Sequence, residues 1–108
     1  MLNKFEESVR AYLKALAINN TSPECHFNLA TAYNDLGQYK QAIKHYQSAI
    51  NLDNTNVDAH LCLGGVYESL NQFEKAAAAF QNVLQIDPES TKALEALEKI
   101  RQQKNTAA

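Results

Sequence analysis

The chain has 108 residues, of which 45% are hydrophobic and 20% charged, and its formal net charge is −2. This length allows one compact unit or a short run of repeats, and the composition is that of a folded globular protein. The slightly acidic balance argues against nucleic acid or an anionic membrane as partner, and the longest apolar run, Ala76 to Phe80, is too short to cross a bilayer.

The apolar spacing predicts helices throughout the chain. Steps of three and four residues separate the apolar side chains of each run, as one face of a helix requires. Ser22-Pro23-Glu24 is typical of a helix start, and Gly37 and Asn71 follow apolar runs where a left-handed residue ends a helix. We therefore predict six helices and no strand, at residues 2–18, 23–36, 39–52, 57–70, 73–86 and 90–104.

The sequence also repeats itself at a spacing of 34 residues. This shift aligns Tyr33 with Tyr67 and Ala42 with Ala76, and conservative pairs fill the positions between them. A two-helix unit repeated at this period indicates a stacked helical array, in which each repeat contacts its neighbours.

The repeat resembles the tetratricopeptide-repeat (TPR) family. The family's first-helix step, Leu-Gly/Ala-x-x-Tyr, is present twice, at Leu29, Ala30, Tyr33 and at Leu63, Gly64, Tyr67. The small residue and the aromatic residue of its second helix are also present twice, as Ala42, Tyr46 and as Ala76, Phe80. The closing proline is Pro88 in one unit and Asn54 in the other, so we expect a looser junction there. The resemblance implies an all-α, right-handed α-solenoid of antiparallel helix pairs.

The repeat divides the chain into four parts. Residues 23–56 and 57–90 are complete repeats, whereas residues 1–22 match the second helix of an incomplete repeat whose first helix is missing. Residues 91–108 are expected to form a C-terminal capping helix and tail, because Glu98 replaces the small motif residue.

The motif residues themselves are expected to be structural, because small residues let helices approach and aromatic residues fill the space between them. The resemblance implies that the first helix of each pair lines a concave groove. Helical geometry then selects the groove-facing residues, which are Glu24, Phe27, Asn28, Thr31, Asn34, Asp35, Asp58, Leu61, Cys62, Gly65, Glu68 and Ser69.

Neither first helix of the two complete repeats contains lysine or arginine, while both carry acids at their ends. One interpretation is a groove that prefers a basic or polar peptide. The other is that acids such as Glu24 and Asp58 only solvate a helix face and complement the helix dipole.

Asn28 has two interpretations as well. In the family, asparagines at this position often bind the backbone of a ligand, since an amide donates and accepts at once; alternatively, Asn28 only meets solvent. The family members that hold the C-terminal carboxylate of heat-shock chaperones use lysine and arginine on neighbouring first helices. This chain has Asp58 and Cys62 there, so we predict that a chaperone carboxylate is not its ligand.

No catalytic, cofactor or metal site is predicted. His26 and His60 share a repeat position, which places their rings about 10 Å apart across packed helices, too far to bind one metal ion. Both are expected to be partly buried packing residues. Cys25 and Cys62 occupy different repeat positions, and the sequence has no phosphate-binding loop or nucleophile elbow.

The function that the sequence favours is a protein–protein interaction module, a scaffold or adaptor that binds an extended or helical peptide of a partner. A second hypothesis is a substrate-recruiting segment of a larger enzyme, such as a protein glycosyltransferase. A third is self-association through the exposed N-terminal helix. The chain does not open on a secretory leader and has two cysteines, so the expected compartment is the cytoplasm.

Overall fold

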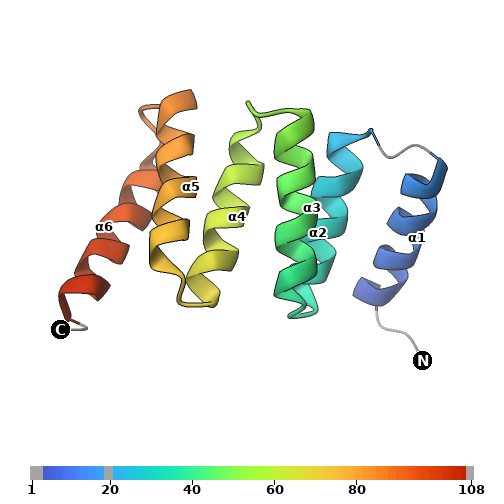
Figure 1. Ribbon diagram of the computed structural model, residues 1–108, viewed down its shortest axis with the longest axis horizontal. Coiled ribbons are helices and arrows are strands. Elements are labelled where there is room, and N and C mark those ends of the chain that lie inside the picture. The colour runs from blue at the N-terminus through green and yellow to red at the C-terminus, as the bar shows by residue number, and fades with distance from the viewer. Residues whose placement is uncertain (1–3, 19–20, 107–108) are drawn as a thin grey trace.

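The computed structural model describes residues 4–18 and 21–106, and its regular elements there are all helices (Figure 1). Their bounds fall within two residues of the prediction: α1 (Lys4–Ile18), α2 (Pro23–Asp35), α3 (Tyr39–Leu52), α4 (Val57–Ser69), α5 (Phe73–Ile86) and α6 (Thr91–Thr106). Residues 2–3 of the first predicted helix and residues 107–108 of the predicted tail lie outside the described residues. Each described helix is too short or too polar to cross a bilayer.

The turns after α2 and α4 contain the left-handed residues that the sequence predicts. Gly37 has a φ of 76° and Asn71 a φ of 60°. In the first turn the N–H of Gln38 donates to the carbonyl of Tyr33 at 2.9 Å, and the second turn repeats this bond. Such a bond satisfies a carbonyl that the end of the helix leaves without a partner.

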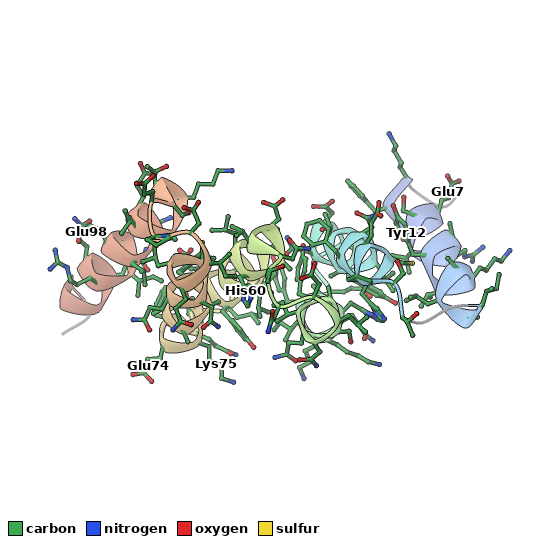
Figure 2. The ribbon with its side chains drawn as sticks, turned by 90° about the horizontal axis from the view of Figure 1, so that it is seen from above. Glu7, Tyr12, His60, Glu74, Lys75 and Glu98 are labelled. Atoms are coloured by element: carbon green, nitrogen blue, oxygen red, sulfur yellow. The ribbon has the colours of Figure 1, made fainter. Side chains whose placement is uncertain are left out.

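The helices form an α-solenoid of antiparallel pairs in two layers. Figure 2 shows α2 and α4 on one side of the array and α3 and α5 on the other. Each helix packs chiefly against its neighbours in the chain, and α2 also touches α4. The bounds of α4 and α5 repeat those of α2 and α3 after 34 residues, so the period read from the sequence is that of the helix pairs.

Small residues let the paired helices approach closely, as predicted. Ala30, Ala42 and Ala76 are completely buried. Gly64 is the tightest position, since a Cβ atom added there would lie 2.6 Å from a ring carbon of Phe80. The aromatic ring of α5 therefore occupies the space that any larger residue on α4 would need.

Gly64 and Gly65 offer a matched pair of substitutions. We expect Gly65→Ala to raise the free energy of unfolding by about 0.5–1 kcal/mol, because nothing lies within 4 Å of its added Cβ and alanine favours the helix. Gly64→Ala should instead lower it, by about 1–3 kcal/mol, because the buried Phe80 ring must move. Urea denaturation of both variants measures the change in the free energy of unfolding. Equal effects would mean that α4 and α5 lie further apart than the contact between Gly64 and Phe80 indicates.

The two complete repeats share a backbone pattern but not every side-chain contact. Tyr33 is half-buried and stacks on the ring of His45, with 5.7 Å between centroids. Its counterpart Tyr67 is buried, and its hydroxyl accepts a hydrogen bond from Gln47 at 3.2 Å. The tyrosines differ because Ala79 occupies the repeat position of His45 and offers no ring to stack on.

Candidate functional site

Side-chain caps set the starts of α2 and α4. The Ser22 hydroxyl accepts a hydrogen bond from the backbone N–H of Cys25, and the side-chain Oδ1 of Asn56 accepts one from the backbone N–H of Ala59, both at 3.1 Å. The first turn of α2 carries Glu24, and that of α4 carries Asp58. Both carboxylates therefore lie at the positive ends of helix dipoles, where negative charge is stabilised.

These two helix starts border one pocket of about 370 Å³, which we call the α2–α4 pocket. It brings together four residues predicted to face the groove, Glu24, Phe27, Asn28 and Asp58. Three further lining residues were missed, because they are not on the helix faces that the prediction considered: Pro23, Asp53 and Asn56.

Asp53 adds a third carboxylate to the α2–α4 pocket. Its Oδ1 accepts hydrogen bonds from the hydroxyl and the backbone N–H of Thr55, at 2.6 and 3.1 Å. The side-chain bond first, and then the backbone bond, hold the pKa of Asp53 below its ordinary value. The pocket is thus lined by three acids and by no lysine or arginine, which makes it electronegative at neutral pH.

Phe27 forms the apolar wall of the pocket, and Tyr46 supports it from within. The two rings meet edge to face, with 5.7 Å between centroids. Thr31 donates its hydroxyl proton to the Phe27 carbonyl at 3.1 Å, so Tyr46 must donate to the Thr31 oxygen, at 2.8 Å. Burial is the main cause that raises the pKa of Tyr46, which keeps this donor protonated.

Cys62 also turns toward this network. It is half-buried and interacts with the Tyr46 hydroxyl, and burial is the main cause that raises the pKa of its thiol. The raised pKa keeps the Cys62 thiol protonated at neutral pH, and a half-buried, protonated thiol is a packing group rather than a nucleophile. Two of the predicted groove residues, Thr31 and Cys62, therefore hold Tyr46 in place.

The remaining predicted residues do not join the α2–α4 pocket. Gly65, Glu68 and Ser69 line a second pocket of about 380 Å³ near the other end of α4, together with Lys99 of α6. Leu61 packs against the core. Half-buried Asn34 and exposed Asp35 lie near the end of α2 and line neither pocket. The residues predicted to form one groove are thus divided between two separate pockets. In the second pocket, Lys99 adds a positive charge to the lining that contains Glu68.

His26 and His60, which were predicted to be partly buried packing residues, are buried, and they form contacts that the repeat did not predict. His26 and His60 are 9% and 6% exposed. The Nδ1 atoms of His26 and His45 lie 3.1 Å apart, and the two rings stack with 5.3 Å between centroids. Periodicity gave no signal for this pair, because the counterpart of His45 is Ala79.

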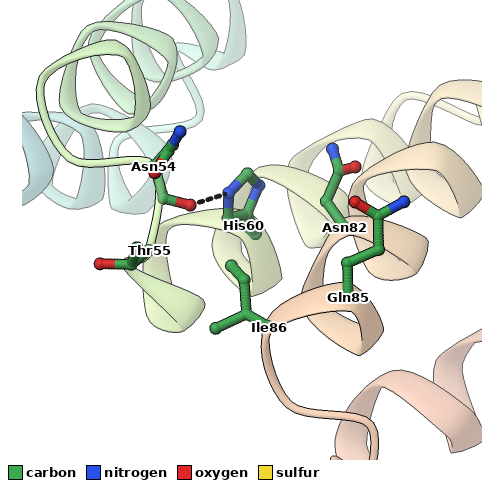
Figure 3. A pocket seen from close by; sticks show the side chains of 6 residues that line it. All are labelled: Asn54, Thr55, His60, Asn82, Gln85 and Ile86. Atoms are coloured by element: carbon green, nitrogen blue, oxygen red, sulfur yellow. Dashed lines mark hydrogen bonds between the residues drawn. The ribbon is translucent and has the colours of Figure 1, made fainter.

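His60 instead donates through Nε2 to the backbone carbonyl of Asn54 at 3.1 Å, as Figure 3 shows. It lines a pocket of about 410 Å³ whose other lining residues are uncharged: Asn54, Thr55, Asn82, Gln85 and Ile86. Among the residues that the structure describes, no group of three or more His, Cys, Asp or Glu side chains is arranged to hold a metal ion.

Comparison with known proteins identifies the repeat. A family model described as "TPR repeat" matches residues 2–37 and 31–71, and one described as "Tetratricopeptide repeat" matches residues 57–90. Together these matches span residues 2–90. No curated protein sequence is similar enough to count as a match.

Several solved structures have the same fold. The TPR domain of Arabidopsis OM64 is 29% identical, with a TM-score of 0.86 over 93% of this chain and 83% of that one. The first TPR of Spaghetti (RPAP3), bound to the HSP90 peptide SRMEEVD, is 26% identical, with a TM-score of 0.87 over 93% and 79%. MamA is 27% identical, with a TM-score of 0.88 over 90% of this chain, which spans only 57% of the MamA chain.

Proposed function

Because the chain belongs to the tetratricopeptide-repeat family, we propose that it is a protein-interaction module that binds a peptide segment of a partner protein in the α2–α4 pocket. The observation that supports this most is that one pocket combines an apolar wall, Phe27, with a side-chain amide, Asn28, at the starts of two helices. An aromatic wall gives a peptide side chain something to pack on, and an amide pairs with its backbone. The peptide held by the similar RPAP3 domain supports a protein ligand.

Charge defines the kind of peptide. Glu24, Asp53 and Asp58 surround the apolar wall without a neighbouring cation in the lining. A ligand with lysine or arginine beside an apolar residue complements such a site. The HSP90 peptide on the RPAP3 domain ends in Glu-Glu-Val-Asp, and like charge disfavours a tail of this kind here.

We place the activity of this module in binding rather than in catalysis. The histidines and cysteines of the described chain take part in packing, with the pKa of Cys62 raised and that of His45 lowered by burial. Both cysteines are free thiols, which fits a reducing compartment such as the cytoplasm. In a longer protein the same pocket would recruit substrates to an attached enzyme, which remains our second hypothesis.

Removing two carboxylates tests the ligand class. We expect Glu24→Gln combined with Asp58→Asn to raise the dissociation constant of a Lys-Leu-Lys peptide about threefold to tenfold, since exposed charge contacts contribute modestly. The matched control is Gln41→Lys combined with Gln81→Lys. It changes net charge by the same +2 at exposed positions of α3 and α5 and should leave binding nearly unchanged.

Fluorescence anisotropy at low and high salt measures the dissociation constant of the peptide for the unmodified chain and both double variants. Circular dichroism verifies that the variants fold. Binding of the basic peptide should weaken as salt rises, because exposed charges are screened over about 8–10 Å. A Glu-Leu-Glu peptide and SRMEEVD serve as acidic probes. Tighter binding of either acidic probe, or equal effects of the two double variants, would overturn the proposed ligand class.

A further inference from the structure

His26 of α2 and His60 of α4 occupy the same repeat position but have different neighbours. Beside His26, α3 supplies the ring of His45, which stacks on it with 5.3 Å between centroids, and the two Nδ1 atoms are hydrogen-bonded at 3.1 Å. The residue of α5 at the repeat position of His45 is Ala79, whose side chain is a single methyl group. The second repeat therefore has no ring of its own to place beside His60 as His45 is placed beside His26.

The pocket of about 410 Å³ that His60 lines borders this place, and we call it the α4–α5 pocket. Two further lining residues, Asn82 and Ile86, follow Ala79 by three and seven residues. Residues with this spacing lie on one face of a helix, so the pocket extends along α5 from the position where a counterpart of His45 would stand.

His60 offers this pocket a hydrogen-bond acceptor. The residue is only 6% exposed, and its Nε2 is bonded to the carbonyl of Asn54. Because a carbonyl oxygen only accepts, Nε2 carries the proton, and Nδ1 of the neutral ring is an acceptor. Within the described part of the chain Nδ1 has no hydrogen-bond partner, although none of the fully buried side-chain nitrogen and oxygen atoms there lacks one. Nδ1 is therefore accessible from the pocket, and Figure 3 shows it on the side of the ring nearer to Asn82.

We propose that the α4–α5 pocket binds an imidazole ring of a ligand, in the place beside His60 that His45 takes beside His26. The ligand ring donates its N–H to Nδ1 of His60 and stacks on the His60 ring, as the pair in the first repeat does. Among the described residues, the lining of the pocket includes no charged side chain. A neutral ring therefore enters without a repulsive or unpaired charge.

The amides of the lining indicate where such a ring comes from. Asn54, Asn82 and Gln85 each present a side-chain amide, which can donate to and accept from a peptide backbone. A histidine in an uncharged peptide uses both the ring site and these amides, whereas a small molecule that contains imidazole uses the ring site alone. The observations thus favour a peptide histidine. The α2–α4 pocket and the α4–α5 pocket share no described lining residue, so this inference does not depend on the basic peptide proposed above.

NMR titration of the unmodified chain at pH 8, where imidazole rings are mostly neutral, tests the ring site. Imidazole should shift the amide signals of α4 and α5 around His60, with a dissociation constant in the millimolar range because the probe has few atoms. 1-Methylimidazole, which has no N–H to donate, should bind about fivefold more weakly or less. The peptide acetyl-Gly-His-Gly-amide should bind about tenfold more tightly than imidazole, through the added backbone contacts. Equal binding of peptide and imidazole would assign the ring site to a small molecule instead.

A matched pair of variants tests the position of the bound ring. Ala79→His supplies the ring from α5 itself and should abolish imidazole binding. Ala78→His adds the same ring at an exposed position of the same helix and should leave binding unchanged. Circular dichroism verifies that both fold.

His60→Leu tests the same point without adding a ring at position 79. It removes the acceptor and introduces the residue that α6 has at this repeat position, Leu94, and it should also abolish binding. The proposal is overturned if imidazole does not bind the unmodified chain or if 1-methylimidazole binds as tightly. Imidazole binding that survives His60→Leu overturns it as well.

Discussion

Replacing Phe80 with alanine should lower the free energy of unfolding by about 3–5 kcal/mol, the range for removing a buried aromatic ring. Phe80 is 3% exposed, belongs to the main core cluster and contacts Gly64 across the α4–α5 pair. An array this short holds each repeat only through its neighbours, so the structure has few other contacts to compensate. Urea denaturation monitored by circular dichroism measures the loss.

Leu52→Ala is the control for this substitution. Leu52 also lies on the second helix of a repeat, but it is 46% exposed, so we expect a loss below about 1 kcal/mol. If Phe80→Ala is as mild as Leu52→Ala, the second repeat does not pack around Phe80 as described. A lower denaturant slope in Phe80→Ala would indicate that the repeats no longer unfold together.

Acid should destabilise the first complete repeat through His45. Burial, the neighbouring His26 and then Lys44 lower the pKa of His45 to about 4, from an ordinary value of 6.5. The unfolded chain therefore binds a proton below about pH 6.5, whereas the folded chain does not until about pH 4. Stability falls as the pH falls through this window, and His45 alone should remove about 2 kcal/mol between pH 7 and pH 5.

The variant His45→Ala isolates this contribution. It places in the first repeat the residue that the second repeat has at position 79. The variant is expected to be less stable at pH 7, because the stacking on Tyr33 and His26 is lost. The difference in free energy of unfolding between pH 7 and pH 5 should nevertheless shrink by about 2 kcal/mol. An unchanged pH dependence would mean that His45 is protonated in the folded state.

Part of the candidate site could be predicted from the sequence. Glu24, Phe27 and Asn28 share one face of a helix by their spacing, and a shift of one repeat brings Asp58 to the matching place on α4. Asp53 could not be predicted in the same way, because it follows α3 in a loop. Whether a loop side chain reaches the pocket depends on the backbone conformation of the loop, and helical periodicity predicts side-chain directions only within a helix.

The sequence by itself determined the helices, their ends and their order in the array. Apolar steps of three and four residues, a glycine and an asparagine in left-handed turns, and a period of 34 residues depend on backbone geometry, which the two repeats share. Only the tertiary structure decided which side chains meet. His26 and His45, whose rings contact each other, are 19 residues apart on different helices. Lys99 of α6 lines the same pocket as Glu68 of α4. Such contacts depend on the size and direction of side chains across a helix interface, and these differ between repeats that have the same backbone.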